Sequence, residues 1–552
     1  MTFKKILLSL FLPAALSGYS QSVIDSVWTL VSDATGGDYV TDLYVTPNGN
    51  SYVLGHIGQL PGNPNVDGLM LLKSDSDGAE VWRQYIFPVN GNWGLFAKGV
   101  TGDMQGNVYV LFNENYRYSD HASARVLLRK YDAAGSILWT QCITPDQNGL
   151  IESPATRQLI YKDGFLFCGG SLYQDVLASG SSMDGLIYKF DADDGSVVNR
   201  ITYNSSYNSD DLFRDIHVDA AGSIWAIGRS RGYAGPGGVY SHYDSLTARY
   251  SPEGNLLWQH RLNGSGNSED WGINLDVDAN GNAVISSQLK ALSISQKQVH
   301  AQKLSSSGVV QWTHTYQGSS SEYNWDQPVE FMPNGNVLLV NSCADGIRSV
   351  ALNAASGAVI WENFYERDDT GAYNRPRHTL VDDQGNIYIT GRSRDNTPMG
   401  DGYDMATLKY SPSGELLWES HYSYGNYDTA GDEGVKLGLD ASGNLYAIGW
   451  IQDAANNDDF ALLKYGASSL SVQPFTAENT KVYPNPAVDF VRVRSDVALT
   501  SAELYDLGGR LVRQWKLSTP DERLDLEGIA PSVYLLQVRT TDGSSSFKIS
   551  KM

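Results

Sequence analysis

The sequence predicts an all-β protein, namely an eight-bladed β-propeller that is closed by its N-terminal strand and followed by a small C-terminal β-sandwich. Three observations predict this architecture. A turn-and-strand phrase recurs along most of the chain, a tryptophan-bearing strand ends nearly every repeat, and one such strand stands alone near the N-terminus. The composition agrees, because 33 Tyr and 13 Trp among 552 residues favour strands and 55 Gly favour tight turns.

The repeat is defined by a glycine turn followed by a strand, as in "TPNGNSYVLG" (46–55) and "DDQGNIYITG" (382–391). A degenerate copy, "YKDGFLFCGG" (161–170), fills the one gap in the series. Successive turn glycines lie 50 to 59 residues apart, which is a spacing typical of repeat architectures. The eight turn glycines are Gly49, Gly106, Gly164, Gly222, Gly281, Gly335, Gly385 and Gly443.

Each repeat reads as four strands, which we name A to D. Strand A alternates apolar and polar residues, as in 211–219, and strand B follows the glycine turn. Strand C, as in 405–411, leads through a second glycine turn (411–414) to strand D with its tryptophan. Short alternating strands separated by turn residues indicate an all-β fold, and repeated four-stranded units indicate propeller blades.

The segment around Trp28 explains how the repeats would form a ring. "SVWTLV" (26–31) has the phrasing of a D strand, but no A, B or C strand precedes it. The last repeat (432–466) has the opposite defect, because no D strand follows its first three strands. Pairing the surplus strand with the incomplete repeat would remove the exposed sheet edges. We therefore expect residues 26–31 to pair with the sheet that ends near Tyr465.

The tryptophans of the D strands have two interpretations. They form either a ring of aromatic ligand subsites or a set of packing residues between neighbouring blades, where each buries roughly 150–250 Å². Only the degenerate third repeat lacks the residue, and a position filled in almost every repeat belongs to the framework. We favour packing for Trp28, Trp82, Trp139, Trp258, Trp312, Trp361 and Trp418.

An Asp or Asn recurs before strand A, and a cation recurs near the end of strand C. One interpretation is a ring of carboxylates at the mouth of the central channel, able to hold a cation or polarise a sugar. The other, which we favour, is that Asp and Asn fix the entrance to strand A, with some pairing to the cations. The channel-mouth candidates are Asp38, Asp211, Asp270, Asn324, Asn374 and Asp432, and the cations are Lys73, Lys130, Lys189, Arg249, Lys303, Lys409 and Lys464.

Binding residues on a rigid repeat scaffold are expected where the repeats differ. The most divergent segments are the loops between strands B and C at 230–244 and 394–404, and the loop before strand A at 365–378. Loops positioned by a rigid scaffold are common sites of binding. We expect ligand contacts there.

Two short motifs have a catalytic or metal-binding pattern but fit the repeat better. "GRSRG" (228–232) has the Gly-x-Ser-x-Gly pattern of a nucleophile elbow, yet no helical segment follows Ser230, as that motif requires. "DVDANG" (276–281) resembles the start of a calcium loop, but Ser287 stands where a bidentate Glu is needed. No His or Cys spacing indicates zinc. We expect no catalytic residue and no cofactor, with Ca²⁺ as the one metal ion left open.

The N-terminus predicts export. Residues 1–20 combine Lys4 and Lys5 with an apolar stretch (6–16) and small residues, as a secretory signal peptide does. That stretch is too short to span a bilayer, and no later segment is apolar for long enough to anchor the chain. Three cysteines are fewer than a disulfide-stapled exported domain carries, although one pair could bond. They are Cys142, Cys168 and Cys343.

The formal net charge of −22 limits the classes of partner. An acidic surface repels phosphate backbones and anionic lipids, so we exclude nucleic-acid and membrane-surface binding. The same charge disfavours gripping a polyanionic polysaccharide over a wide face. Neutral or cationic partners fit better.

The phrasing of the repeats resembles two known repeat families. "DMATLKYSPSGELLW" (404–418) looks like the bacterial β-propeller repeat of secreted proteins, and this resemblance covers most of residues 26–466. The Gly-x-Leu-Leu-Trp piece is also similar to pyrroloquinoline-quinone-type propeller repeats. That second resemblance is confined to the turn between strands C and D. Nothing in the chain matches a quinone-binding site, so it implies no cofactor.

The C-terminal region resembles the type A sorting domain of the type IX secretion system of Bacteroidota. The matching pieces are "VYPNP" (482–486), "ELYDLGGR" (503–510), "VYLLQV" (533–538) and "FKISK" (547–551). The alternation in these pieces also predicts a small β-sandwich. The resemblance implies Sec export to the periplasm and then outer-membrane passage through the type IX machinery, which this domain contacts. The protein would then be extracellular or held on the outer cell surface.

These expectations give a signal peptide at 1–20, a propeller at 21–466, a linker at 467–480 and a sorting domain at 481–552. The function we expect is that of a secreted or surface-attached, non-catalytic propeller that binds glycans or proteins. The alternative is a carbohydrate-active hydrolase or lyase that uses channel-mouth carboxylates. A structural component of the cell surface or biofilm is a third possibility.

Overall fold

A computed structural model of the chain divides into two units, residues 1–467 and residues 468–552, and we describe each by itself. The expected signal peptide (1–20), the expected linker (467–480) and Asn324 lie outside the described residues. Those residues contain strands and turns but no helix, which confirms the all-β prediction. The described residues are 22–23, 26, 28–32, 37–59, 67–88, 93–116, 125–143, 149–150, 158–174, 182–205, 210–233, 240–264, 269–290, 297–317, 327–343, 346–366, 374–397, 400–423, 431–452, 458–466, 481–495, 498–505, 511–540 and 544–552.

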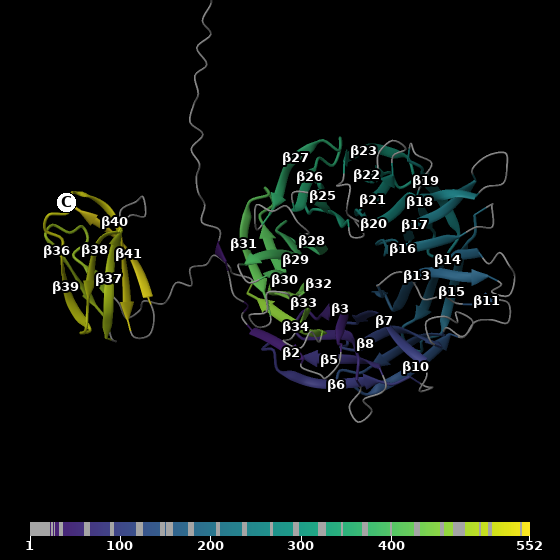
Figure 1. Cartoon of the computed structure of the whole chain (residues 1–552), viewed down its shortest axis with the longest axis horizontal. Coiled ribbons are helices and arrows are strands. Elements are labelled where there is room, and N and C mark those ends of the chain that lie inside the picture. Colours follow the sequence, from purple (N-terminus) through teal and green to yellow (C-terminus); the bar gives the residue numbers. More distant parts are fainter. Residues whose placement is uncertain are drawn as a thin grey trace, which may run out of the picture. The chain divides into compact units, whose positions relative to one another are not determined.

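Unit 1 consists of repeated antiparallel sheets, mostly four-stranded, that are arranged around a common centre as in a propeller (Figure 1). In the first half of the chain they are β3 (Tyr39–Val45), β4 (Ser51–Ile57), β5 (Gly68–Ser74) and β6 (Glu80–Ile86); β7 (Trp93–Gly102), β8 (Val108–Tyr116), β9 (Arg125–Tyr131) and β10 (Ile137–Ile143); β11 (Gly149–Leu150), β12 (Ile160–Lys162), β13 (Phe165–Gln174), β14 (Ser182–Asp191) and β15 (Val197–Tyr203); and β16 (Asp211–Val218), β17 (Ile224–Tyr233), β18 (Tyr240–Tyr250) and β19 (Leu256–Leu262).

The second half of unit 1 continues the pattern, and two short N-terminal strands join its last two sheets. These sheets are β20 (Trp271–Val277), β21 (Ala283–Lys290), β22 (Lys297–Leu304) and β23 (Val310–Gln317); β24 (Val329–Phe331), β25 (Val337–Cys343), β26 (Gly346–Leu352) and β27 (Val359–Tyr365); β28 (Arg375–Val381), β29 (Ile387–Thr397), β30 (Gly400–Tyr410) and β31 (Leu416–Tyr422) with β1 (Ser22–Val23); and β32 (Glu433–Leu439), β33 (Leu445–Gln452) and β34 (Asp458–Tyr465) with β2 (Trp28–Ser32).

The glycine turns have the conformation that the repeat predicts. Gly49 and Gly385, which join strands A and B in their sheets, have φ of +83° and +82°. The N–H of Gly49 donates to the carbonyl of Thr46 at 2.9 Å and closes the turn. An L-residue rarely adopts this φ, so glycine is required where the hairpin reverses.

The inner strand of most sheets carries a β-bulge near its start. The pairing of β28 with β29 shifts between Pro376 and His378, and the pairing of β32 with β33 shifts between Gly434 and Lys436. A bulge places two consecutive residues opposite one partner and re-aims their side chains. The same shift occurs in β3, β7, β16 and β20.

Side chains of strands C and D hold each sheet to the next one along the chain. The Nε1 of Trp82 and the Nζ of Lys73 both donate to the carbonyl of Ala133, at 3.1 and 2.7 Å. Ala133 lies in the next C–D turn, where Gly135 leaves room for the Trp82 ring. These contacts confirm that such tryptophans pack between sheets, and the cations bind turn carbonyls. The same arrangement joins Arg249 and Trp258 to Ser306, and Lys303 and Trp312 to Ala354.

The first and last sheets of unit 1 are also in contact. β2 pairs antiparallel with β34 and becomes the fourth strand of the last sheet. The Nζ of Lys464 donates to the carbonyl of Ser76 at 2.8 Å, and the Nζ of Lys436 lies 3.7 Å from a carboxylate oxygen of Asp42. β1 adds a fifth, parallel strand to the preceding sheet, on the outer edge of β31.

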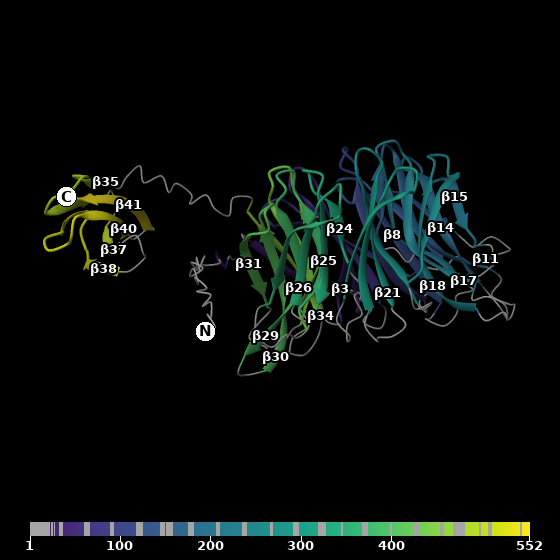
Figure 2. The same cartoon turned by 90° about the horizontal axis from the view of Figure 1, so that it is seen from above.

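Strands B and C form long hairpins in two sheets, β17–β18 and β29–β30, whose extended ends lie in the divergent segments that the sequence singles out. β29 and β30 pair from Ile387 to Thr397, and this hairpin extends from one face of unit 1 (Figure 2). None of the three cysteines forms a disulfide bond, and burial raises the pKa of Cys168 to about 12.

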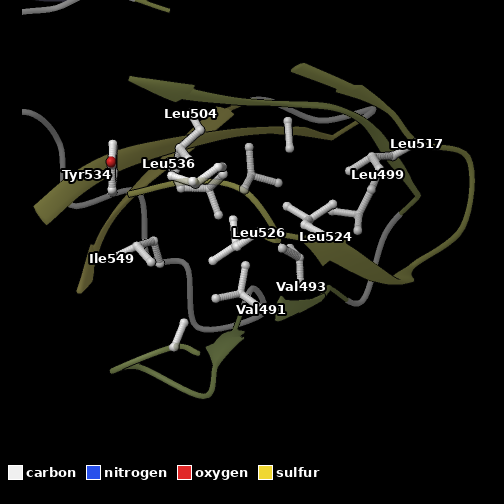
Figure 3. Packing of buried hydrophobic residues seen from close by; sticks show 14 residues of the cluster. Val491, Val493, Leu499, Leu504, Leu517, Leu524, Leu526, Tyr534, Leu536 and Ile549 are labelled. Atoms are coloured by element: carbon white, nitrogen blue, oxygen red, sulfur yellow. The ribbon is translucent and has the colours of Figure 1, made fainter. Parts of the chain in front are cut away.

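Unit 2 is a β-sandwich, as predicted. Its apolar core draws on both sheets, with Val491 and Leu524 from one and Leu504, Leu536 and Ile549 from the other (Figure 3). One sheet has the order β35 (Lys481–Tyr483), β36 (Phe490–Arg494), β39 (Asp521–Asp525), and the other has the order β38 (Leu511–Lys516), β37 (Leu499–Tyr505), β40 (Ser532–Thr540), β41 (Ser544–Lys551).

Candidate ligand-binding cavity

The predicted channel-mouth residues lie at the entrance to the inner strands, where their side chains accept hydrogen bonds from the backbone. Asp38 accepts from the N–H of Gly58 at 3.0 Å, and Asp432 accepts from the N–H of Gln452 at 2.8 Å. Asn374 accepts from the N–H of Arg394 at 2.9 Å in the same way. In each case the partner is 20 residues further along. Gln452 ends β33, Gly58 directly follows β4, and Arg394 lies three residues before the end of β29. The side chain therefore ties the two ends of the A–B hairpin together.

Asp270 and Asp211 make additional backbone contacts of this kind. Asp270 accepts from the N–H of Lys290 at 2.9 Å and from the N–H of Gly264 at 2.5 Å. Asp211 accepts from the N–H of Ser205 at 2.6 Å and from the Oγ of Ser230. Burial raises the pKa of Asp211, and it raises those of Asp38 and Asp270 to about 6. A ligand-binding role for these residues stays a prediction.

The residue that follows four of the five described anchors lies at a cavity. A cavity of about 1230 Å³ lies between the inner strands β3, β16, β20, β24, β28 and β32. Tyr39, Leu212, Trp271 and Arg375 line it, and each directly follows an Asp or Asn of the anchoring set. None of the five described anchors is among its lining residues. The anchors thus fix the strand starts from which the lining residues extend.

The first layer of the cavity, which we call the upper layer, is aromatic and cationic. It includes the strand-A starts Tyr39, Trp271 and Arg375, together with Arg229 and Trp450, which lie in strand B opposite the starts of strand A. Leu212 and Asp458 line the cavity at the same ends of their strands. The ring of Tyr39 stacks on His56 with 4.7 Å between centroids, and 42% of Tyr39 remains exposed. The strand-A starts among these residues differ from repeat to repeat, as expected of a binding surface on a symmetric scaffold.

Below the upper layer, charged side chains are joined in pairs across neighbouring sheets. The Nε and one terminal nitrogen of Arg377 each lie 2.9 Å from an oxygen of Glu433, in a bidentate pair. The carboxylate of Asp215 accepts from the N–H of Leu275 at 3.1 Å and from Asn274 at 2.8 Å. Burial raises the pKa of Asp215 to about 6. These bonds fix the inner strands relative to one another.

The lower layer is formed by His217, Asp276 and Glu330, further along the inner strands. A ring nitrogen of His217 lies 3.6 Å from a carboxylate oxygen of Asp276, which also accepts from the N–H of Phe331 at 2.8 Å. The Oγ1 of Thr379 donates to Glu330. Burial, reinforced by the charge of Asp276, raises the pKa of Glu330 to about 7. Burial lowers the pKa of His217. The lower layer therefore holds carboxyls in unlike surroundings.

Two motifs noted in the sequence have structural positions within unit 1. Ser230 is buried within β17, where it donates to Asp211, and no strand-to-helix turn presents it. The carboxylate of Asp278 in the calcium-like segment accepts from the N–H groups of Asn280 and Asn282, at 2.9 and 2.8 Å, as in a hairpin turn. Across the described part of the chain, no group of three His, Cys, Asp or Glu side chains is placed to hold a metal ion.

Sequence reasoning did not identify the cavity residues. The signal was present, because Tyr39, Leu212, Trp271 and Arg375 occupy one repeat position with four different side chains. The sequence did not show which strand positions face the cavity, since each bulge shifts the alternation of side chains. Of the divergent hairpins, β17–β18 contributes to the cavity. Arg229 of β17 lines the cavity, and Tyr243 of β18 contacts Arg229.

Comparison with known proteins identifies both units. Residues 481–552 match the secretion system C-terminal sorting domain, and residues 184–448 match a family described as outer membrane protein assembly factor BamB. The chain is a β-propeller repeat protein with a C-terminal sorting domain of the type IX secretion system. That domain directs export to the cell surface or the extracellular space. In the described residues, no helix has the length and apolar character needed to cross a membrane.

Curated proteins include no sequence that matches this chain. Solved structures with similar folds include PorZ of Porphyromonas gingivalis, a surface component of the type IX secretion system (12% identity, 93% of this chain and 81% of that chain, TM-score 0.29). Others are a protein of unknown function from Bacteroides caccae (11%, 70% and 94%, TM-score 0.30) and the Dos1 propeller (10%, 79% and 94%, TM-score 0.43). The TM-scores are below 0.5, so these three structural similarities give no information about function.

Proposed function

We propose that this protein is a secreted or surface-attached propeller that binds a glycan in its central cavity without catalysis. The observation that supports this proposal most directly is the upper layer, where Tyr39, Trp271 and Trp450 surround one cavity together with arginines. Aromatic faces pack against the apolar faces of sugar rings, and guanidinium N–H groups donate to sugar oxygens. Such convergent polar groups in an apolar concavity are typical of small-ligand sites.

The size of the cavity also favours a glycan over a folded protein. Small-ligand pockets are usually about 300–1,000 Å³, and this cavity of about 1230 Å³ has room for several sugar units. Trp271 and Arg229 line a concavity, whereas a protein partner needs a broad surface of about 800 Å² on each side. A chain end or a short oligosaccharide is the ligand that fits.

We also propose that the repeated sheets are eight blades of one ring that β2 closes. The pairing of β2 with β34 supports closure, as do the contacts of Lys464 with Ser76 and of Lys436 with Asp42. A closed ring would hold the inner strands at fixed positions around the cavity and leave no sheet of the ring incomplete.

The binding proposal is tested by a glycan array probed with the chain from residue 21 onward. Binders found on the array would then be titrated against the variant Trp271→Ala. We expect at least about a tenfold loss of affinity, because buried aromatic anchors dominate binding sites. Phe87→Ala removes an aromatic residue that is 52% exposed and outside the cavity, and should bind normally. An array without binders, or full binding by Trp271→Ala, would contradict the proposal.

One observation favours a second function, that of a glycoside hydrolase or lyase. Glu330, with a pKa of about 7, lies beside the carboxyl of Asp276 in the lower layer. A carboxyl that is protonated near neutral pH beside a second carboxyl is the arrangement used for general acid catalysis in glycoside hydrolysis. Incubating the array binders with the protein and measuring new sugar ends tests this function. Cleavage that Glu330→Gln abolishes would establish it and contradict the non-catalytic proposal.

A further inference from the structure

Arg229 occupies an unusual environment in the upper layer. Its guanidinium carbon lies 4.2 Å from the ring centroid of Tyr243 and 4.7 Å from that of Trp271. Its Nε is buried without a hydrogen-bond partner, and across the described chain this arginine has no ion pair. Three other cations of the cavity differ, since Arg377 is paired with Glu433, Arg375 lies 3.9 Å from the same carboxylate, and Lys436 lies near Asp42.

The two rings that hold Arg229 are themselves fixed. The Oη of Tyr243 donates to the carboxylate of Asp210 at 3.0 Å. Trp271 follows Asp270, whose side chain accepts two backbone hydrogen bonds at the start of β20. The guanidinium therefore has little freedom to rotate. The two rings lie against it, so it can bind a ligand only through the N–H groups in its own plane. This pre-organisation reduces the entropy lost when a ligand binds.

We propose that Arg229 forms a carboxylate subsite, so that the glycan bound in the cavity carries a uronic acid. This inference rests on the proposed glycan-binding function and names its ligand class. A guanidinium donates two parallel N–H bonds to a carboxylate, and such charge-assisted pairs are about twice as strong as neutral ones. The net charge of −22 opposes a ligand with many anionic groups. A glycan with one uronic acid at Arg229 and neutral sugars against the aromatic side chains satisfies both conditions.

The chain provides a matched control for Arg229. Arg392 occupies the same position in the repeat, in "GRSRD" (391–395), where Arg229 stands in "GRSRG" (228–232). Its guanidinium carbon lies 4.6 Å from the ring centroid of Tyr403, but Arg392 is not among the cavity-lining residues. The two arginines thus share their phrasing and one aromatic contact and differ in access to the cavity.

The test uses the full chain from residue 21 and oligosaccharides in matched pairs. Each pair consists of a neutral oligosaccharide and the corresponding uronate, which has a carboxylate at C6 in place of the hydroxymethyl group. Calorimetric titration should show tighter binding of the uronate by the wild type. Arg229→Gln should lower the affinity for the uronate by about 10- to 100-fold, as expected for a charged hydrogen bond, and leave the neutral sugar unchanged. Arg392→Gln should change neither affinity.

A further variant and three other outcomes distinguish failure of the carboxylate subsite from failure of the glycan-binding proposal. Arg229→Lys keeps the positive charge but loses the two parallel N–H donors of the guanidinium, so it should retain only part of the preference for the uronate over the neutral sugar. Thermal melting checks that each variant is folded. Equal binding of both members of a pair, unchanged in Arg229→Gln, would overturn the carboxylate subsite and leave glycan binding intact. Binding of no sugar at all would overturn the proposed function itself. A parallel loss of both affinities in Arg229→Gln would reassign Arg229 to a general role in the site.

Discussion

Glu330 shows how a single residue couples the cavity to pH. Its pKa is raised from 4.5 to about 7, mainly by burial, so the folded protein binds a proton there that the unfolded chain releases between these values. The free energy of unfolding therefore falls as pH rises from about 4.5 through 7. The pKa difference limits this loss of unfolding free energy to about 3 kcal/mol. Solvent at the partly exposed side chain makes the actual loss smaller.

We expect Glu330→Gln to stabilise the propeller by about 1–2 kcal/mol at pH 8, since the amide removes the charge that burial disfavours. At pH 5, where Glu330 is protonated in the folded protein, the substitution should have little effect. Urea unfolding at both pH values measures the difference. Glu415→Gln, at an exposed position on the C–D turn, serves as the control, and a pH-independent effect of Glu330→Gln would refute the prediction.

Trp312 represents the tryptophans that join neighbouring sheets. It is only 6% exposed, its Nε1 donates to the carbonyl of Ala354 at 3.0 Å, and Gly357 of that turn lies against its ring. Trp312→Ala should cost about 3–5 kcal/mol of unfolding free energy, as for other buried tryptophans. Trp312→Phe should recover most of this loss, whereas Val309→Ala, at a residue 63% exposed, should be neutral within about 0.5 kcal/mol. Chemical denaturation would measure all three, and a small loss in Trp312→Ala would argue against a packing role.

At the scale of elements, four A–B hairpins combine an anchor with a lining residue, namely those that begin at Asp38, Asp211, Asp270 and Asn374. Asp270 holds the start of β20 through the N–H groups of Gly264 and Lys290, and Trp271 follows it into the cavity. The anchor recurs because every hairpin needs the same backbone contacts. The lining residue varies because only some positions around the cavity meet a ligand. Stability and specificity are thus assigned to adjacent residues.

Asp270→Ala should therefore affect both properties. It leaves two backbone N–H groups without an acceptor, which we expect to cost about 1–3 kcal/mol of unfolding free energy. It should also weaken glycan binding, because the start of β20 no longer fixes Trp271. Asp278→Ala removes a similar acceptor from the A–B turn of the same sheet, at the opposite end of β20 from Trp271, and should leave affinity unchanged. Equal affinity in both variants would show that the anchor does not position the site.

The sequence predicted these elements better than it predicted the site. The turn glycines, such as Gly49 and Gly385, have the positive φ expected of them, because a tight hairpin restricts the residue at that point. Repeat position alone does not show which way a side chain extends. At the bulge of β28, the consecutive residues Arg377 and His378 both line the cavity, which strict alternation along a strand does not allow. In 228–232 the pattern drew attention to Ser230, but Arg229 is the residue that lines the cavity.

At the scale of the whole propeller unit, the cavity differs from the average composition of the chain. The formal net charge is −22, yet arginines and aromatic residues form the upper layer, while the carboxyls of Asp276 and Glu330 lie deeper. An acidic exterior keeps an exported protein soluble and repels polyanions. The arginines of the upper layer then provide a local site for a ligand with few negative charges. This arrangement requires that the inner strands remain fixed around the cavity.

Closure of the ring by β2 would provide that fixation, and it can be tested with two pairs of proline substitutions. Leu30→Pro/Val31→Pro removes two adjacent N–H groups from β2 and disturbs the packing of Leu30 against the core between the last and first sheets. Proline within a paired strand removes a hydrogen bond of the sheet. If β2 closes the ring, the single unfolding transition of the propeller should move to lower denaturant concentration as a whole, and glycan binding should weaken with it. Ser22→Pro/Val23→Pro makes the same change in β1, which only adds to the outer edge of β31, and should leave the transition within about 0.5 kcal/mol of the wild type. Equal effects of the two pairs, or a loss limited to the N-terminal residues, would mean that the sheets hold their positions without this strand.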